Sequence, residues 1–283
     1  MAMQRIPGKQ IAQQILDELK AEIQSKNLRP KLGVLLVGDD PASSLYVSLK
    51  RKAASDIGIM TDIRKLPAGT TDEELKKVIE SWNIDPEVSG ILIQLPLPEG
   101  HDTDALIAAI DPKKDADGFH QQNVLALKTG EAKIIPPLHE GILRLIASTG
   151  VTPNHSLAII VANSHIFADP LKYILEKAGA TVRVMLASDA TKPLRAGVDD
   201  KDLREADIIV VAVGKAGFLT ANSVQDGAVV IDVGTNKTPD GRVRGDFDPD
   251  GTDHMAGWYT PVPGGVGPMT VAMLMKTVKE MAG

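Results

Sequence analysis

The chain has 283 residues and a formal net charge of −6; 43% of its residues are hydrophobic, 24% are charged, and none is cysteine. This length allows two ordinary domains, and the composition is that of a globular protein. The lack of cysteine excludes disulfides, thiolate metal sites and a cysteine nucleophile, and the acidic balance without a dense Lys/Arg block argues against a nucleic-acid partner.

Neither a membrane partner nor a bound metal is expected. No apolar run approaches the roughly 20 residues that a transmembrane helix needs, and the first five residues lack the apolar stretch of a secretory signal. The six histidines are scattered, without a pair at metal-ligand spacing. We therefore predict a cytoplasmic protein with no metal and no membrane contact.

Helical patterns alternate with short apolar runs, which is typical of an α/β protein with mostly parallel sheets. An apolar stripe at four-residue spacing predicts a helix over 10–26. The patterns that follow predict a strand at 31–37, a helix ending near Ile57 before Gly58, a strand at 60–66, a helix from a Thr71–Glu74 capping box to about residue 82, and a strand at 90–94.

A second series begins after Asp117-Gly118. It predicts helices at 139–149 and 170–177, strands at 157–161, 181–186, 207–213 and 228–233, and a final amphipathic helix at about 269–281. The best place for a domain boundary is residues 118–138.

Tyr46 and Lys50 are four residues apart in the second predicted helix, so their side chains share one face. A phenol can stack on a planar ligand, and an ammonium can donate hydrogen bonds or stabilise negative charge. Taken alone, such a pair is more often a solvated lysine beside a half-buried tyrosine than a ligand site.

Gln94 ends an apolar strand, at the edge where open α/β sheets bind ligands. Its amide could orient a lysine or a substrate, or simply cap backbone groups. Asp117 stands before a glycine, where a turn carboxylate could accept hydrogen bonds from an amino-pyrimidinone ring, or form an ordinary Asx turn. Three prolines and three glycines in segment 259–270 fix an unusual backbone path, for close approach to a ligand or for a rigid connection.

Together these segments resemble the bifunctional methylenetetrahydrofolate dehydrogenase/cyclohydrolase family. Each motif alone is weak evidence, but the ordered set is specific, because it follows the family's order and approximate spacing along nearly the whole chain. The matching segments are 38–43 (Gly-Asp-Asp-Pro-Ala-Ser), 46–53, 90–98 (ending Gln-Leu-Pro-Leu-Pro), 114–119 (Lys-Asp-Ala-Asp-Gly-Phe), 230–234, 245–247 and 261–270 (Pro-Val-Pro-Gly-Gly-Val-Gly-Pro-Met-Thr).

The resemblance implies two α/β domains with a folate site in the cleft between them. Residues 1–118 would form the catalytic, folate-binding domain, to which the C-terminal helix at about 268–283 returns. Residues 119–267 would form a Rossmann-like dinucleotide-binding domain. A homodimer through that second domain is also implied.

The implied activity is oxidation of 5,10-methylene-tetrahydrofolate by hydride transfer to NADP or NAD, followed by hydrolysis of the methenyl product to 10-formyl-tetrahydrofolate. Lys50 would be the catalytic lysine, with its pKa lowered by burial and by a cationic substrate. Gln94 would position Lys50, Tyr46 would pack against the folate and support the lysine, and Asp117 would hold the pterin ring. Further substrate contacts are implied for Pro263, Gly264 and Gly265.

The dinucleotide half departs from the family. Its phosphate-binding turn, Gly-Arg-Ser-x-x-Val-Gly-x-Pro, corresponds here to residues 162–170. Ala162 and Ala168 replace the two glycines, where a Cβ would strain a turn with positive φ and obstruct a pyrophosphate. Asn163 replaces the arginine that would pair with the 2′-phosphate of NADP. Asp169 is expected in the first helical turn, where its charge would compete with phosphate.

Residues 136–139, Pro-Pro-Leu-His, also replace the family's Pro-Cys-Thr-Pro. Asp189 could hydrogen-bond to a ribose hydroxyl of NAD. Segments 213–215 and 232–234 keep the family sequence, either to bind the cofactor or for packing alone. The candidate cofactor-binding residues are Ala162, Asn163, Ser164 and Thr235.

Three functions remain open from the sequence alone. The first is a cyclohydrolase coupled to a dehydrogenase that uses NAD or NADP. The second is a cyclohydrolase with a decayed cofactor site, and the third is a folate-binding protein without catalysis.

Overall fold

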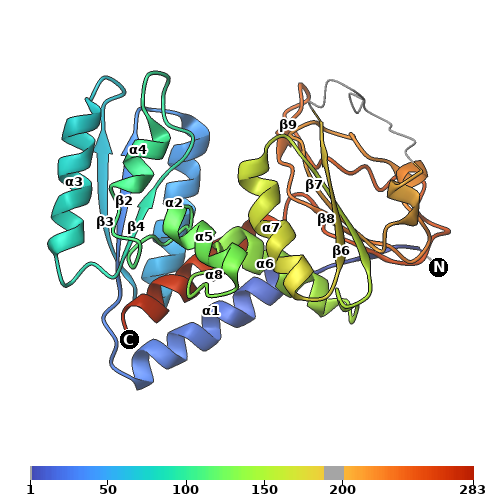
Figure 1. Cartoon of the computed structure of the whole chain (residues 1–283), viewed down its shortest axis with the longest axis horizontal. Coiled ribbons are helices and arrows are strands. Elements are labelled where there is room, and N and C mark those ends of the chain that lie inside the picture. The colour runs from blue at the N-terminus through green and yellow to red at the C-terminus, as the bar shows by residue number, and fades with distance from the viewer. Residues whose placement is uncertain (1, 188–200) are drawn as a thin grey trace. The chain divides into compact units, whose positions relative to one another are not determined.

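The computed structural model describes residues 2–187 and 201–283 and contains two compact units (Figure 1). Unit 1 comprises Met1–Ile11 with His139–Met269, and unit 2 comprises Ala12–Leu138 with Thr270–Gly283. No helix in the described part of the chain is long and apolar enough to cross a membrane.

Unit 2 is built on a parallel sheet in the order β3–β2–β4. Its strands are β2 (Lys31–Val37), β3 (Met60–Leu66) and β4 (Gly90–Ile93). Its helices are most of α1 (Gly8–Ser25), α2 (Pro41–Ile57), α3 (Asp72–Ile84), α4 (Thr103–Ala108), α5 (Gln121–Thr129) and most of α8 (Val266–Met281).

The period-two alternation of β2 divides the core of unit 2 into two layers. Leu32 and Val34 pack in a cluster with residues of α1, α2 and α8, while Leu35 and Val37 pack in a second cluster with residues of α3 and α4. Six of the seven residues of β2 are therefore buried, as expected for a parallel strand covered on both faces.

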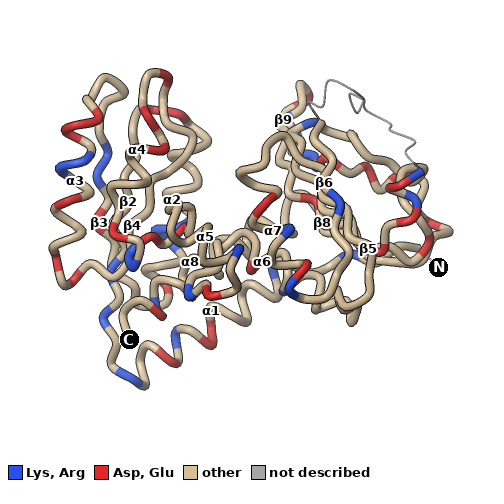
Figure 2. The backbone as a smooth tube through the Cα atoms, viewed as in Figure 1, with Lys and Arg blue, Asp and Glu red and all other residues tan. Residues whose placement is uncertain are grey.

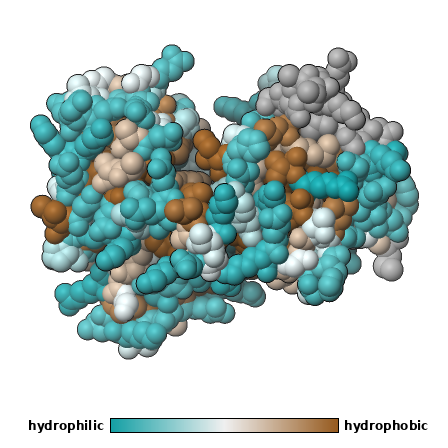
Figure 3. All heavy atoms as spheres, viewed as in Figure 1, coloured by the Kyte–Doolittle hydropathy of each residue, from teal (hydrophilic) through white to brown (hydrophobic). Residues whose placement is uncertain are grey.

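Helix ends in unit 2 follow local signals in the sequence. The Asp40 carboxylate accepts the Ser43 N–H at 2.6 Å where α2 begins, and Gly58, at φ 91°, ends the same helix. The predicted capping box of Thr71 and Glu74 is confirmed at the start of α3. Figure 2 shows acidic and basic residues along α3, and hydrophilic side chains dominate the face seen in Figure 3.

Unit 1 is built on a six-stranded sheet in the order β1–β11–β8–β7–β5–β6, with every pairing parallel. Its strands are β1 (Gln4–Arg5), β5 (Leu157–Ala162), β6 (Thr181–Leu186), β7 (Ile208–Ala212), β8 (Val229–Asp232) and β11 (Trp258–Tyr259). A separate antiparallel hairpin joins β9 (Asn236–Lys237) to β10 (Val243–Arg244).

The strand order of unit 1 reverses at β5, since β6 pairs on one side of it and β7 on the other. Open α/β sheets bind ligands at the carboxyl ends of the strands beside such a switch point. Helices α6 (Pro137–Ser148) and α7 (His165–Lys177) accompany this sheet, together with short 3₁₀ helices at Leu203–Glu205 and Ala221–Ser223.

The predicted strands are found within two residues of their expected ends, but other expectations differ from the structure. Helix α7 begins at His165 and contains Pro170, whereas the prediction started the helix at that proline. Helices α4 and α5 and the two-residue strands were not predicted, because they are too short to display a period.

The division of the chain also differs from the expected domains. Residues 1–11 belong to unit 1, because β1 pairs with β11, and residues 119–138 belong to unit 2. Asn123, on α5, donates a hydrogen bond to Asp115 at 3.0 Å within unit 2. Thr270–Gly283, which includes most of α8, also lies in unit 2.

Candidate active site

Lys50 and Gln94 meet in unit 2, although 44 residues separate them in the sequence. Helix α2 carries Lys50, and Gln94 follows the last residue of β4. The Lys50 Nζ donates to Gln94 Oε1 at 3.0 Å, and Gln94 Nε2 donates to the Leu95 carbonyl at 2.7 Å. Because that carbonyl can only accept, it fixes the orientation of the amide and turns the Gln94 oxygen towards the lysine.

Burial lowers the pKa of Lys50, and the negative charge of Asp117 opposes this effect. Burial likewise raises the pKa of Asp117 to about 6, while Lys50 acts in the opposite direction and Asp115 reinforces the rise. Asp117, in the turn after α4, is therefore influenced by Lys50 from α2 and by Asp115 from its own turn, and such perturbed charged groups are typical of functional sites.

Tyr46 lies one helical turn before Lys50 on α2, with its side chain 38% exposed. This large side chain is exposed to solvent. Its ring is therefore accessible for contact with a ligand.

Pro263, Gly264 and Gly265 lie in unit 1, immediately before α8. The Gly264 carbonyl accepts the Lys9 N–H at 2.9 Å, and Gly265 is buried against Gly8. Gly8 has to be glycine here, since a Cβ on it would lie 2.9 Å from the Gly265 Cα, and a Cβ on Gly265 would lie 2.6 Å from the Thr260 Cβ. The unusual path of this segment is thus held by the chain that follows β1.

The predicted cofactor residues lie at the carboxyl ends of the strands of unit 1. Ala162 is the last residue of β5, and neither Ala162 nor Ala168 has a positive φ, so the expected strain is absent. Both alanines are fully buried. Asn163 donates its side-chain amide to the Val213 carbonyl across the switch point, and Ser164 begins α7 without a capping hydrogen bond from its side chain.

Of the two expectations about charge at this turn, one needs correction and the other concerns a residue outside the described part of the chain. Asp169 is in the second turn of α7 rather than the first, because the helix starts at His165, and its carboxylate contacts His165 Nδ1 at 2.9 Å. Asp189 lies outside the described residues. Thr235 is exposed and follows Gly234 after β8.

Segment 213–215 binds a carboxylate of the protein itself. Asp246 accepts the consecutive N–H groups of Val213, Gly214 and Lys215, the last two at 2.9 and 2.8 Å, and also the Asn236 amide at 2.8 Å. These three N–H groups are therefore already satisfied. The segment is fixed by packing within unit 1, which was one of the two possibilities that the sequence left open.

Asp232 forms the second half of this carboxylate pair. It accepts the N–H groups of Gly234, Asp246 and Phe247 at 2.9, 3.0 and 2.8 Å. Burial raises the pKa of Asp232 to about 7, although these backbone N–H donors favour the charged form. Gly245 has to be glycine here, because a Cβ would lie 2.8 Å from the Asp232 carboxyl carbon.

His139, in the segment that departs from the family motif, is fully buried in unit 1. Its Nε2 lies 2.9 Å from the Phe167 carbonyl, and the two rings stack with centroids 5.2 Å apart. Burial lowers the pKa of His139 to about 4, so the ring is neutral at pH 7. The histidine therefore acts as a packing contact between α6 and the first turn of α7.

Two models of one protein family match the two parts of the chain. The catalytic domain of tetrahydrofolate dehydrogenase/cyclohydrolase matches residues 6–117, and the NAD(P)-binding domain of the same family matches residues 136–283. The chain belongs to the tetrahydrofolate dehydrogenase/cyclohydrolase family.

Relatives in this family are similar along their whole length. A bifunctional protein FolD from Moorella thermoacetica is 40% identical over 285 residues, which cover 100% of this chain and 99% of the relative. One from Xanthomonas euvesicatoria is 44% identical over 98% of this chain and 91% of its own length.

Solved structures of the family have the same fold. The Campylobacter jejuni FolD methylenetetrahydrofolate dehydrogenase/cyclohydrolase has a TM-score of 0.90 at 37% identity and covers 99% of each chain. The Trypanosoma brucei enzyme, solved with NADP and an inhibitor, has a TM-score of 0.91 at 33% identity and covers 99% of this chain and 97% of its own.

The turn after β5 fits the dinucleotide that binds to this family's second domain. A helix N-terminus attracts phosphate through its free N–H groups and its dipole, and Ser164 leaves those of α7 uncapped by its side chain. The methyl groups of Ala162 and Ala168 are buried rather than on the surface of the turn. The two glycine replacements are therefore compatible with NAD(P) binding in this family member.

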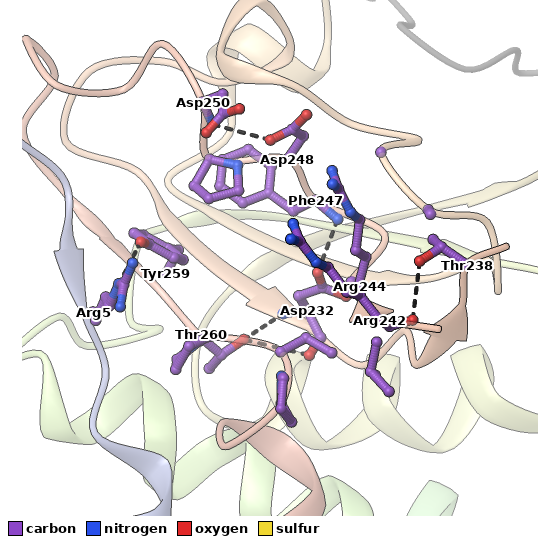
Figure 4. A pocket seen from close by; sticks show the side chains of 18 of the residues that line it. Arg5, Asp232, Thr238, Arg242, Arg244, Phe247, Asp248, Asp250, Tyr259 and Thr260 are labelled. Atoms are coloured by element: carbon purple, nitrogen blue, oxygen red, sulfur yellow. Dashed lines mark hydrogen bonds between the residues drawn. The ribbon is translucent and has the colours of Figure 1, made fainter. Parts of the chain in front are cut away.

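A cavity of about 870 Å³ lies elsewhere in unit 1, beside Asp232. In Figure 4, Arg5 and Tyr259 pair at one side, with the Arg5 Nε donating to the tyrosine oxygen at 2.9 Å, and Arg242 and Arg244 lie beside Phe247. Its lining also includes several aspartates. Neither Lys50 nor Ser164 lines this cavity, but Pro263, one of the predicted substrate contacts, does.

Proposed function

We infer that the chain interconverts one-carbon units on tetrahydrofolate. It is a 5,10-methenyl-tetrahydrofolate cyclohydrolase coupled to an NAD(P)-using 5,10-methylene-tetrahydrofolate dehydrogenase. Similarity to bifunctional relatives over the full length supports both activities, rather than a cyclohydrolase alone or a folate-binding protein without catalysis. The single observation that carries the catalytic assignment is the Lys50–Gln94 hydrogen bond of 3.0 Å at the carboxyl end of β4.

Lys50 is the proposed proton-transfer group of the hydrolysis. Its lowered pKa increases the neutral fraction that can accept a proton from the attacking water. The water oxygen bonds to the methenyl carbon, the bond from that carbon to N5 breaks, and the formyl group stays on N10. One proton of the water ends on N5 and the other is released to solvent. Gln94 holds the lysine in place by accepting a hydrogen bond from its Nζ.

Asp117 and Tyr46 are the proposed folate contacts of unit 2. An ionised Asp117 can accept hydrogen bonds from the pterin N–H donors, and the exposed Tyr46 ring can stack on the folate. Pro263, Gly264 and Gly265 are proposed as further substrate contacts, supported by the fixed path of that segment.

NAD(P) supplies the hydride acceptor of the dehydrogenase. We propose that Ala162, Asn163 and Ser164 hold it through the N-terminus of α7, with Thr235 after β8 as a further contact. Unit 2 is accordingly the proposed catalytic unit, and unit 1 the proposed dinucleotide-binding unit.

We also propose a cytoplasmic homodimer that associates through unit 1. The cysteine-free composition supports the location, and Val243 in the β9–β10 hairpin, which is 38% exposed, offers an apolar contact. Light scattering after gel filtration would test the dimer, and cell fractionation would test the location.

The test of the function follows the absorbance of methenyl-tetrahydrofolate in the presence of the purified protein. The assay is then repeated from methylene-tetrahydrofolate with NAD and NADP separately. We expect hydrolysis and reduction of at least one nucleotide. Hydrolysis alone would overturn the dehydrogenase assignment, and silence in both assays would leave only folate binding.

A further inference from the structure

The turn that carries Asp117 is attached to the edge of the sheet of unit 2 through its backbone. Ile91, in β4, donates its N–H to the Lys114 carbonyl at 2.6 Å, and the Ile91 carbonyl accepts the Ala116 N–H at 3.0 Å. These two bonds bracket Asp115 and place it beside the strand that leads to Gln94. The turn and the Lys50–Gln94 pair therefore share one scaffold.

Asp115 is buried, at 2% exposure, and both its oxygens accept hydrogen bonds. Its Oδ1 accepts the Gly118 N–H at 3.0 Å, and its Oδ2 accepts the His120 N–H at 2.8 Å and the Asn123 amide at 3.0 Å. A buried carboxylate with three donors is a strong backbone anchor, because charge-assisted hydrogen bonds are about twice as strong as neutral ones. Asp115 thereby joins β4, which it bridges at Ile91, to the first turn of α5.

Asp117 lies between Asp115 and the groups that the Asp115 carboxylate holds. The backbone after it turns at Gly118, where a side chain would be disfavoured because φ is 73° and a Cβ would lie 3.2 Å from Pro136. Two charged groups act on the Asp117 carboxylate, namely Lys50 from α2 and Asp115 from its own turn. No direct ion pair joins Asp117 to Lys50 among the described residues, so the turn rather than a salt bridge sets its direction.

We infer that Asp115 is a positioning residue for Asp117. Its carboxylate binds backbone N–H groups after Asp117 and adds a negative charge next to it, so that it sets both the direction and the charge environment of the folate-binding carboxylate. This inference rests on the proposed role of Asp117 in the cyclohydrolase. Both oxygens of Asp115 are bound within the protein, so Asp115 acts through Asp117.

The test compares Asp115→Asn with Asp115→Glu, using Asp111→Asn as the matched control. Asp111 lies four residues earlier and accepts the Lys113 N–H at 3.0 Å, so the control makes the same chemical change without touching the Asp117 turn. The methenyl-hydrolysis kcat and KM are measured from pH 5 to pH 8 for each variant and for the wild type.

For Asp115→Asn we expect a KM at least tenfold higher, with a smaller fall in kcat, and an acid limb of the kcat/KM profile at lower pH. The limb moves because a negative charge that raises the Asp117 pKa is gone. Asp115→Glu keeps the charge and should return the limb towards its wild-type position, although its longer side chain leaves KM raised. Asp111→Asn should match the wild type.

A purely structural role would reduce the yield of active protein and leave the acid limb in place. A folded Asp115→Asn variant with unchanged KM and unchanged limb would overturn the inference. If this variant does not fold, Asn123→Ala removes only one donor and keeps the charge. It should raise KM about threefold with the limb unmoved, and a wild-type KM would again refute the positioning role.

Failure of the proposed function gives a different result. Asp117→Asn should raise KM more than Asp115→Asn does. If Asp117→Asn leaves KM unchanged, the role of Asp117 is wrong, whereas a raised KM in that variant alone refutes only the inference about Asp115.

Discussion

Each unit has a pair of aspartates beside a strand of its parallel sheet, and the two pairs differ in how many internal hydrogen bonds their carboxylates accept. In unit 1, Asp232 and Asp246 both accept several backbone N–H groups and fix the loops after β7 and β8. In the unit 2 pair, Asp115 accepts backbone N–H groups in this way, whereas Asp117 is influenced by the charge of Lys50.

Because of this difference, the carboxylates of unit 1 only hold their loops in place, whereas the turn of unit 2 keeps a carboxylate that can bind a ligand. A carboxylate whose oxygens bind three or four internal N–H groups has little capacity left for a substrate. A second carboxylate beside such an anchor gains a fixed direction and keeps its acceptors. The comparison therefore predicts chemical consequences for variants of the unit 2 pair and stability consequences for variants of the unit 1 pair.

The largest effect is expected for Lys50→Met. It removes the group that accepts the proton of water, and general acid–base catalysis typically contributes about 10²–10⁴-fold. Methenyl hydrolysis should fall by about 10³-fold, while thermal unfolding and folate binding stay nearly unchanged. Turnover within a few-fold of the wild type would refute the catalytic role of this lysine.

Asp246→Ala should destabilise unit 1. It leaves the N–H groups of Val213, Gly214 and Lys215 without their acceptor; the Val213 bond is buried and the other two are partly buried, and a buried unsatisfied donor costs about 1–3 kcal/mol. We expect the free energy of unfolding in urea to fall by about 3 kcal/mol or more. Asp248→Ala, which removes a carboxylate that accepts the Asp250 N–H at 3.1 Å, is the control and should change stability by less than about 1 kcal/mol.

The pH profile of hydrolysis should show the titration of the Asp117 carboxylate. Its pKa of about 6 means that the carboxylate loses its charge as the pH falls through 6, and with it an acceptor for the pterin. The wild-type kcat/KM should fall about tenfold per pH unit below that point, while Asp117→Asn should lack this limb. An identical limb in both proteins would assign it to another group.

The smallest effect is expected from Asp232, whose pKa of about 7 lies above the ordinary value of 3.8. A raised carboxyl pKa means that the folded state favours the neutral form, so this contribution to stability is complete below pH 4 and is lost as the pH rises through 7. The melting temperature of the wild type relative to Asp232→Asn should therefore fall between pH 4 and pH 7, by about 2–4 °C for each kcal/mol lost. Parallel curves for the two proteins would contradict this.

Much of the fold could be predicted, because a buried parallel strand is a continuous apolar run with clear turns at its ends. The bounds of β2, β3 and β6 agree with the prediction residue for residue. The start of α7 was missed because Pro170 resembles a first helical residue, and in the structure it lies inside the helix. The roles of the predicted site residues remain predictions, although Lys50 and Gln94 lie in hydrogen-bonding contact.

By itself the sequence determined the α/β class, the strand and cap signals and the ordered motifs of the family, since these depend on residues close together in the chain. Only the tertiary structure decided which carboxylates act as anchors. The three backbone donors of Asp246 in segment 213–215 lie 31 to 33 residues away from it. Asp115 and Asp117 belong to one short motif, yet only burial and hydrogen bonding distinguish them. Hydrogen-bond partners across a sheet are set by strand order and register, which local sequence patterns do not encode.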